Sequence, residues 1–181
     1  MIAYKFLRSD GRGVFSGFAW PMPADGRPGP WVEGPVDPCR SGIHACRLRD
    51  LPHWLAHELW EIELDPEPVS VARTKVVAAR GRLLRRIAAW DERARADYAQ
   101  MCTERARARI AENPRLAEWS SVIAPSLAEG PALMGFVAAR VREEHVGADG
   151  YRAEREHQWR WLADRLELGW GEADGAITRP A

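Results

Sequence analysis

Residues 60–64, Trp60-Glu61-Ile62-Glu63-Leu64, alternate between apolar and acidic side chains. Successive side chains of a β-strand point to opposite faces of a sheet, so this alternation predicts a strand with one buried face. Asp65-Pro66 follows, and proline cannot donate a hydrogen bond to a neighbouring strand. We therefore expect the strand to end there, in a half of the chain that is built around a sheet.

Four further segments of this half are rich in residues that favour strands. The runs 2–7 and 14–20 flank residues 9–13, which contain an Asp-Gly turn, and together they predict a β-hairpin. A short strand is expected over residues 39–46 and a longer one over 69–79. With the first strand, these segments predict a small and mostly antiparallel sheet.

Residues 50–59 interrupt the strands with a predicted short helix. Asp50 is a suitable N-cap, and Pro52 lies near the first turn, where a proline has no hydrogen bond to lose. The apolar stripe of this helix consists of Leu51, Trp54, Leu55 and Leu59.

The composition becomes helical after Ile87. Residues 83–87 can start the first helix, and Asn113-Pro114 is expected to end it, because a residue that precedes proline disfavours helical geometry. Gly130-Pro131 predicts the start of another helix, and Asp149 or Gly150 the start of the last. The stripe of the last helix that we expect in the core consists of Trp159, Leu162 and Leu166.

The predicted fold class is α+β, with a small, mostly antiparallel N-terminal sheet packed against a C-terminal group of three or four helices. We expect a β-rich part over residues 1–82 and a helical part over 83–170, together forming one compact domain, and a loose tail over 171–181. A chain of 181 residues can bury a core without a disulfide or a structural metal.

Charge and cysteine content restrict the partners and the compartment. The chain carries 26 basic and 26 acidic residues, so it has no net charge to attract nucleic acid or a membrane surface. No apolar run is long enough to span a bilayer, and the first residues lack the features of a signal peptide. Three cysteines, an odd number, fit a reducing compartment. We expect a cytoplasmic protein without a nucleic-acid or membrane partner, and the oligomeric state stays open.

The basic residues are almost all arginines, with Lys5 and Lys75 as the only lysines. We interpret this bias as the signature of a GC-rich genome rather than of a mechanism. The arginines between residues 73 and 115 are interspersed with acids such as Asp91 and Glu104, which is typical of a solvated helix surface. Nine tryptophans can line a cavity for a flat ligand or simply supply core volume.

Residues 39–57 contain two of the three cysteines and three of the five histidines. Thiolate and imidazole are the usual zinc ligands, and two of these histidines stand four residues apart on the predicted short helix. The spacing matches no standard zinc module, so a core cysteine, a core histidine and two surface histidines are the alternative interpretation. We assign no metal, and any cofactor is unknown. The residues concerned are Cys39, His44, Cys46, His53 and His57.

His44 follows the Ser41-Gly42 turn on a predicted strand. Histidine titrates near neutral pH, so His44 can act as an acid–base catalyst or as a hydrogen-bond donor to a ligand. The alternative is a buried imidazole that is bonded to a backbone carbonyl.

Polar and aromatic side chains occupy two adjoining faces of the last predicted helix. Glu154, Gln158 and Trp161 share one face, and Arg155 and Trp159 share the next. Such a set can form a small-molecule pocket, or it can consist of ordinary surface ion pairs beside a core tryptophan. The candidate catalytic residues are His44, Glu154 and Arg155, and the candidate ligand-binding residues are Tyr151, Gln158 and Trp161.

The stretch from Cys39 to Leu64 contains Cys-x-x-Gly-Ile-His-Ala-Cys, then Asp50-Leu51, then Glu-Leu-Trp-Glu-Ile-Glu-Leu. Over residues 2–87 the chain resembles a family of actinobacterial and phage proteins to which no activity is assigned, so the resemblance transfers no site residue. The order Gly-Ile-His-Ala, short helix, strand is also similar to the opening of ADP-ribosyltransferase-like folds. That likeness implies a glutamate on a late strand, where residues 88–170 predict helices instead.

Three functions are compatible with these patterns. The first is a small-molecule-binding protein, and specifically an enzyme with a pocket between sheet and helices in which His44 serves as acid, base or hydrogen-bond donor. The second is a non-catalytic ligand-sensing or protein-interaction module. The third is a nucleotide-directed, ADP-ribosyltransferase-like protein. A pocket that contains both His44 and polar groups of the last helix would favour the first.

Overall fold

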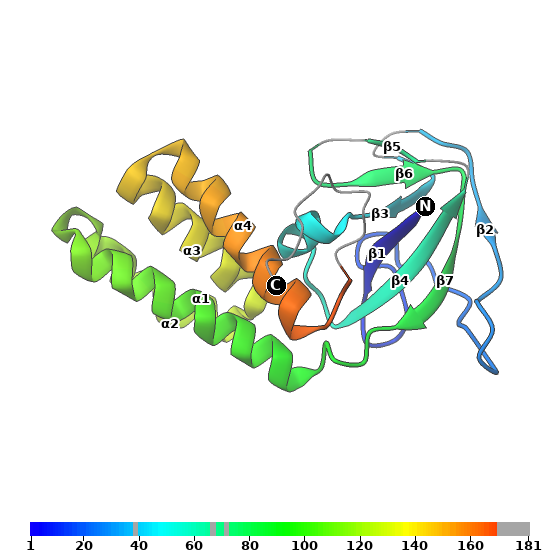
Figure 1. Cartoon of the computed structure of the whole chain (residues 1–181), viewed down its shortest axis with the longest axis horizontal. Helices are drawn as coiled ribbons and strands as arrows, with labels where there is room; N and C mark the ends of the chain where they lie inside the picture. Colours follow the sequence, from blue (N-terminus) through cyan, green and yellow to red (C-terminus); the bar gives the residue numbers. More distant parts are fainter. Residues whose placement is uncertain (38–39, 66–67, 71–72, 170–181) are drawn as a thin grey trace, which may run out of the picture.

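The computed structural model describes residues 1–37, 40–65, 68–70 and 73–169 (Figure 1). Antiparallel strands form the N-terminal half and helices form the C-terminal half, which confirms the predicted α+β class. The strands are β1 (Ile2–Leu7), β2 (Val32–Glu33), β3 (Ile43–Ala45), β4 (Glu58–Asp65), β5 (Val69–Ser70), β6 (Val76–Ala78) and β7 (Arg80–Arg86). The helices are the 3₁₀ segments η1 (Leu48–His53) and η2 (Pro114–Trp119) and the α-helices α1 (Glu92–Glu112), α2 (Ser120–Glu129), α3 (Pro131–Val146) and α4 (Ala148–Arg165).

Two small sheets make up the β half. One has the strand order β1-β4-β7-β2 and the other β3-β6-β5, and every pairing in them is antiparallel. Reciprocal backbone hydrogen bonds between Tyr4 and Cys46 connect the two, since each residue donates to the carbonyl of the other at 2.9 and 2.8 Å. These bonds place the first residues of the chain beside β3.

Strand β4 runs from Glu58 to Asp65 and contains the alternating residues from which the strand was predicted. Its register on β7 shifts between Glu61 and Ile62. Leu59 joins the core under the helices, whereas Trp60, Ile62 and Leu64, which alternate on the other face of the strand, join a second core. One strand thereby contributes to both cores.

The predicted hairpin of residues 2–7 and 14–20 is not formed. Strand β1 pairs instead with β4 over its whole length, from Ile2 opposite Glu63 to Leu7 opposite Glu58. Residues 14–20 follow the left-handed turn at Gly11 as a loop that makes only single bridges, including one between Arg12 and Ala19. The long ladder to β4 accompanies the burial of Ala3, Phe6 and Leu7 of β1, whereas an isolated two-stranded hairpin is only marginally stable.

The expected helix start at residues 83–87 is also wrong, because residues 80–86 form strand β7. Burial alternates from Arg80 to Leu83, which is fully buried, and the register shift opposite Glu61 and Ile62 then brings Arg85 as well as Arg82 opposite glutamates of β4. Arg82 contacts Glu63 at 2.7 Å and Arg85 contacts Glu61 at 2.5 Å. The helical half therefore begins at α1, where the Asp91 side chain caps the helix by accepting from the Ala94 amide.

The segment predicted as a helix over residues 50–59 is shorter and tighter than expected. The 3₁₀ helix η1 spans Leu48–His53, with Asp50 inside its first turn rather than at its N-cap. Strand β4 already begins at Glu58, so His53 and His57 do not share a helical face. Pro52 lies within η1, where the 3₁₀ geometry accommodates it.

Four α-helices make up the C-terminal half, and α3 packs against both α1 and α4 (Figure 1). The end of α1 and the start of α3 agree with the helix boundaries predicted at Asn113-Pro114 and Gly130-Pro131. The close approach of α1 and α3 depends on Gly135, because a Cβ atom there would lie 2.7 Å from the Tyr98 hydroxyl oxygen.

Trp90 packs where the β half meets the helical half. Trp90 is 1% exposed and packs edge-to-face on Phe6 of β1 and on Tyr98 of α1, with ring centroids 6.1 and 6.4 Å away. Its indole N–H donates to the Ala56 carbonyl at 2.8 Å. The larger core accordingly continues from β1 and η1 into all the long helices.

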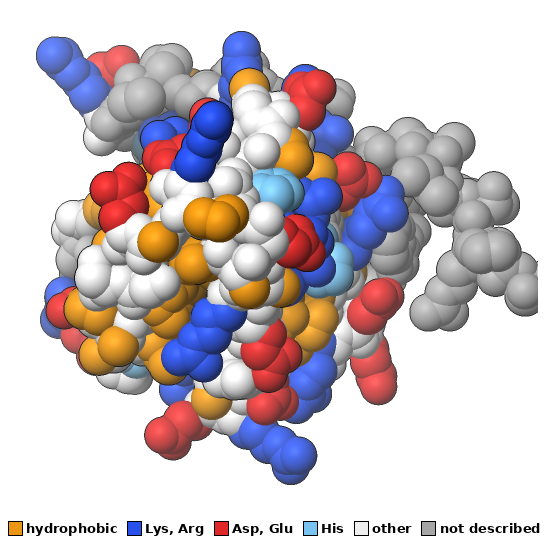
Figure 2. Space-filling model, turned by 90° about the vertical axis from the view of Figure 1, so that its left-hand side faces the viewer, with side chains coloured by type: hydrophobic (Ala, Val, Ile, Leu, Met, Phe, Trp, Pro, Cys, Tyr) orange, Lys and Arg blue, Asp and Glu red, His pale blue; other side chains and the backbone are white. Residues whose placement is uncertain are grey.

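The end of the helical half presents a mixed surface, in which hydrophobic side chains lie among arginines and carboxylates (Figure 2). In the part of the chain that the structure describes, no helix combines the length and the hydropathy needed to cross a bilayer. The partly exposed large apolar side chains of α2 and α3 are Val122, Leu127, Leu133, Phe136 and Val146.

Candidate functional site

The polar residues of the last helix lie inside the protein rather than in a pocket. Gln158 is fully buried, and its amide donates to the Gly135 carbonyl of α3 at 2.9 Å. Its side-chain oxygen accepts from the Tyr98 hydroxyl at 3.0 Å and from Arg155 at 2.9 Å. Arg155 also donates to the Pro52 carbonyl of η1 at 3.1 Å. This network holds α4 to α1, to α3 and to the β half, so the contacts of Arg155 and Gln158 are structural.

Glu154 forms a second buried network on α4. It is 2% exposed and accepts two hydrogen bonds from the Arg105 guanidinium of α1, at 2.7 and 2.8 Å. Arg142 of α3 approaches the same carboxylate at 3.4 Å. The hydrogen bonds to Glu154 are the main cause of a raised pKa for Arg105. With both its oxygens occupied, this carboxylate is a poor candidate for a catalytic base.

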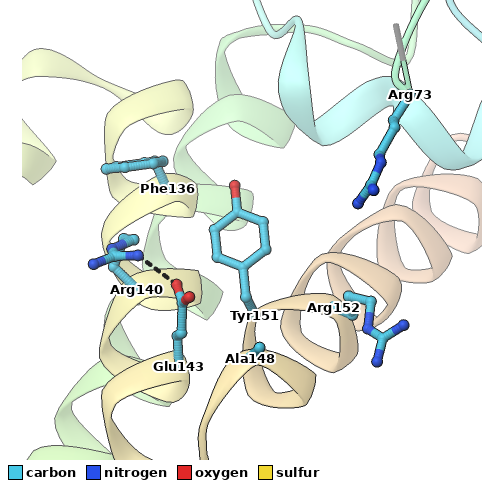
Figure 3. Close-up of a pocket in the computed structure, with 7 residues that line it drawn as sticks. All are labelled: Arg73, Phe136, Arg140, Glu143, Ala148, Tyr151 and Arg152. Atoms are coloured by element: carbon cyan, nitrogen blue, oxygen red, sulfur yellow. Dashed lines mark hydrogen bonds and ion pairs between the residues drawn. The ribbon is translucent and has the colours of Figure 1, made fainter.

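The aromatic candidates of α4 are divided between core and surface. Trp161 packs edge-to-face on the buried Tyr98 ring at a centroid distance of 5.7 Å. Tyr151 lines an open hollow of about 560 Å³ between α3 and α4 (Figure 3). Two arginines of that hollow are engaged with neighbouring acids, Arg140 with Glu143 and Arg152 with Asp149.

His44 lies in a different cavity, of about 680 Å³, which we call the His44 pocket. Its wall is formed by β1, by β3, by the loop of residues 13–20, and by single side chains such as Trp54 and Lys75. The loop covers one side because β1 continues into it, and the Tyr4–Cys46 hydrogen bonds hold β1 against β3. The cavity is within the usual size range of small-molecule sites.

Three cations line the His44 pocket without a neutralising partner. Lys5, Arg40 and Lys75 form no ion pair with any residue that the structure describes. The Lys5 ammonium donates to the His44 carbonyl at 2.6 Å and lies 4.7 Å from the centre of the Trp20 ring. Lys5 and Lys75 are also the only two lysines of the sequence, so both are placed in one cavity.

Aromatic rings form the rest of the wall. Phe15 of the loop packs edge-to-face on Trp54 at 6.1 Å, and Phe18 packs on Trp20 at 5.7 Å. The Lys75 ammonium lies 5.9 Å from the Trp54 ring, whose own N–H donates to the Thr74 carbonyl. Phe15 is 86% exposed, which is unusual for a phenylalanine and leaves an apolar side chain at the rim of the pocket.

The imidazole of His44 is neutral at physiological pH. Burial lowers its pKa most, and the charges of Lys75 and Lys5 lower it further, while a hydrogen bond with the Gly42 backbone acts in the opposite direction. Its Nε2 atom is screened from solvent and has no hydrogen-bond partner among the described residues. A neutral imidazole with an unpartnered nitrogen can accept a proton or a hydrogen bond.

The structure does not bring the predicted catalytic residues together. His44 lines the His44 pocket, but none of Glu154, Arg155 and Gln158 does. The physical reason is the position of η1: its Pro52 carbonyl receives Arg155, so α4 covers η1 and not β3. Neither the hollow beside Tyr151 nor the His44 pocket brings His44 together with these residues of the last helix.

The cysteine and histidine cluster of residues 39–57 is likewise dispersed. Cys46 is buried, and burial raises the pKa of its thiol far above the usual value. Burial, reinforced by the charge of Arg155, lowers the pKa of His53 to about 4. Cys39 lies outside the described residues. Within them, no three histidine, cysteine or acidic side chains gather closely enough to hold a metal ion.

The pKa of Lys5 predicts a pH dependence of stability. Burial lowers this pKa from 10.5 to about 8, so between these pH values the unfolded chain binds more protons than the folded protein. The free energy of unfolding therefore gains a contribution that rises with pH. The buried thiols Cys46 and Cys102, whose pKa values are raised, contribute in the opposite direction.

Comparison with Lys5→Met isolates the lysine, because the thiols are common to both proteins. From about pH 7 to about pH 10.5, we expect the stability of the wild type relative to Lys5→Met to increase by about 1–3 kcal/mol. Urea denaturation at each pH measures it. Parallel pH profiles for the two proteins would contradict the burial of the Lys5 amine.

The chain matches no family model, no curated protein and no solved structure.

Proposed function

We propose that this protein binds a small molecule in the His44 pocket, with His44 as the group that hydrogen-bonds the ligand or exchanges a proton with it. The observation that carries this proposal is the imidazole itself, which lies in the wall of a ligand-sized cavity with its Nε2 unpartnered among the described residues. An unpaired buried polar atom costs on the order of 1–3 kcal/mol, so a partner such as a ligand atom or an ordered water is expected at Nε2.

A ligand can supply the missing partner. Nε2 is screened from solvent, so a ligand in the pocket would reach it after the neighbouring side chains shift. The lowered pKa keeps the ring neutral, so it can accept a proton from a ligand without first losing one. If the protein transforms its ligand, His44 is the acid–base residue of this proposal, and Glu154 and Arg155 have no part in it.

The third hypothesis, an ADP-ribosyltransferase-like protein, has less support. The order strand, short helix, strand is present as β3, η1 and β4. However, no described strand after β4 contains a glutamate, and the chain from residue 92 to residue 165 is almost entirely helical. The residue that such a transferase would need late in the chain has no counterpart in this part of the molecule.

A thermal-shift screen against a metabolite collection tests the proposed function. We compare the wild type with His44→Ala and with His57→Ala, which removes an exposed histidine outside the pocket. A ligand at about 100 times its Kd stabilises by about 2.7 kcal/mol, which raises the Tm of a protein of this size by about 5 °C or more. We expect such a shift for the wild type and for His57→Ala, but not for folded His44→Ala. The absence of any hit, or hits that His44→Ala retains, would contradict the proposal.

A further inference from the structure

The charge on the wall of the His44 pocket differs from the charge on the rest of the protein. The chain has no net charge, and most arginines of the described surface are paired with acids, as in the Arg–Glu pairs between β7 and β4. Lys5, Arg40 and Lys75 are among the exceptions in the described residues, and these three line the one pocket. Glu33 is the only carboxylate in its described wall, and Arg80 pairs with it at 3.5 Å.

An excess of cations in a concave site with apolar walls focuses positive potential on its interior. Lysine presents a compact point charge with three donors, which suits the oxygens of a phosphate or a carboxylate. Although burial lowers the pKa of Lys5 to about 8, the amine still carries its proton at neutral pH, and a bound anion would raise that pKa again. The charge of the wall therefore selects a ligand with a negative group.

The aromatic rings of the pocket wall select a second property of the ligand, its flat shape. Trp20 and Trp54 lie on its wall, each beside a lysine ammonium, and Phe15 and Phe18 extend from the loop towards them. Aromatic walls favour flat, conjugated groups, which stack or pack edge-to-face on them. Because each tryptophan has a lysine beside it, a ring in contact with the tryptophan would hold its substituent within reach of an ammonium.

We propose that the His44 pocket binds an aromatic anion, a flat ring that carries a phosphate or a carboxylate group. The ring packs among the loop phenylalanines and the wall tryptophans, and the negative group is held by Lys5 and Lys75, with Arg40 at the edge of the pocket. A volume of about 680 Å³ accommodates a ring system with a polar substituent. This inference rests on the proposed function, since it names the class of ligand for the same pocket.

Isothermal titration at low ionic strength tests the class with matched probes. AMP and indole-3-acetate are the aromatic anions, one with a phosphate and one with a carboxylate. Adenosine and indole-3-acetamide are their uncharged counterparts, and ribose 5-phosphate is an anion without an aromatic ring. We expect at least one aromatic anion to bind about tenfold or more tightly than its uncharged counterpart and than ribose 5-phosphate, as charge-assisted hydrogen bonds and ring packing both require. Whichever of the two anions binds more tightly shows whether the pocket prefers a phosphate or a carboxylate.

Variants locate the binding. Lys5→Met and Lys75→Met should each weaken the binding of the anion about fivefold or more, with little change for the uncharged probe. Phe15→Ala, which removes an exposed ring and should leave the fold intact, should weaken ring-bearing probes only. Arg73→Met is the control, because Arg73 belongs to the hollow beside Tyr151 and should leave the affinity unchanged.

Two results would overturn the inference. Equal affinity for charged and uncharged probes would show that the cations do not select the ligand. No binding of any probe at concentrations up to about 10 mM would rule out aromatic anions as the ligand class, because most specific sites have a Kd well below this concentration. In either case a thermal-shift hit that requires His44 would leave the proposed function standing, so the two failures can be told apart.

Discussion

Glu154→Ala is expected to destabilise the protein by about 3–5 kcal/mol, the usual cost of removing one partner from a buried ion pair. The carboxylate is 2% exposed and binds Arg105 through two hydrogen bonds, with Arg142 beside it. Without it, two guanidinium groups from α1 and α3 would face each other in a partly buried site. Both the lost hydrogen bonds and the repulsion between the arginines act against the folded state.

Chemical denaturation with urea measures this effect, and Glu156→Ala is the matched control. Glu156 lies on the same helix and is exposed, and among the described residues its one ion pair is with Arg160, one turn further on. Exposed pairs of this kind contribute about 0.3–0.5 kcal/mol, so the control should be close to the wild type. Similar midpoints for the two variants would contradict the burial of Glu154.

Trp90→Ala is the second substitution with a large expected effect, about 3–5 kcal/mol. The indole fills the space between β1 and α1, contacts Phe6 and Tyr98, and donates a hydrogen bond to the Ala56 carbonyl. Its removal leaves a cavity where the two halves of the molecule meet and an unpaired carbonyl beside it. We expect a lowered thermal midpoint and a looser contact between the halves, with earlier amide exchange in both.

Trp159→Ala provides the comparison for Trp90→Ala. The helical stripe of Trp159, Leu162 and Leu166 predicts all three in the core, but only the two leucines are buried. Trp159 is half-buried and packs against the edge of the core, with Arg160 near its outer surface. We therefore expect a smaller loss of stability than for Trp90→Ala, measured by calorimetry. An equal loss in the two variants would show that Trp90, at the junction of the two halves, contributes no more to stability than Trp159 at the edge of the core.

Regular local patterns could be interpreted correctly from the sequence. The alternation of residues 60–64 identifies β4, and Asn113-Pro114 and Gly130-Pro131 identify helix boundaries, because each signal depends on neighbours in the chain. Pairing between distant segments could not be read in the same way. Residues 2–7 have a near neighbour with an Asp-Gly turn, yet they pair with β4 more than fifty residues away.

Strand β7 shows how helix propensity and strand pairing can compete in one segment. The sequence Leu83-Leu84-Arg85-Arg86 suits a helix by composition, since leucine and arginine are good helix formers. The glutamates on β4 decide the outcome, because they place an acid opposite Arg82 and Arg85 along the sheet. That complementarity is tertiary, and it becomes visible only once the register of β4 and β7 is known.

The candidate site was predicted in part. His44 lies in a cavity wall, but the residues expected to accompany it are buried in the helix contacts. Their spacing on α4 is the same whether they face a ligand or neighbouring helices, so periodicity cannot separate the two. A usable signal for the other wall residues was present in the composition. In a chain with 26 basic residues, two isolated lysines stand out as positions where arginine is not used.

The placement of those two lysines has a practical consequence for covalent labelling. Reagents that acylate amines have two side-chain targets in this sequence, and both line a single cavity. The remaining target is the amino terminus, which precedes β1 and donates to the Leu64 carbonyl of β4 at 2.9 Å. Mass added on a lysine side chain is therefore a footprint of one cavity. Because cleavage after arginine places Lys5 in the peptide of residues 1–8 and Lys75 in that of residues 74–80, the footprint resolves the two sides of that cavity independently.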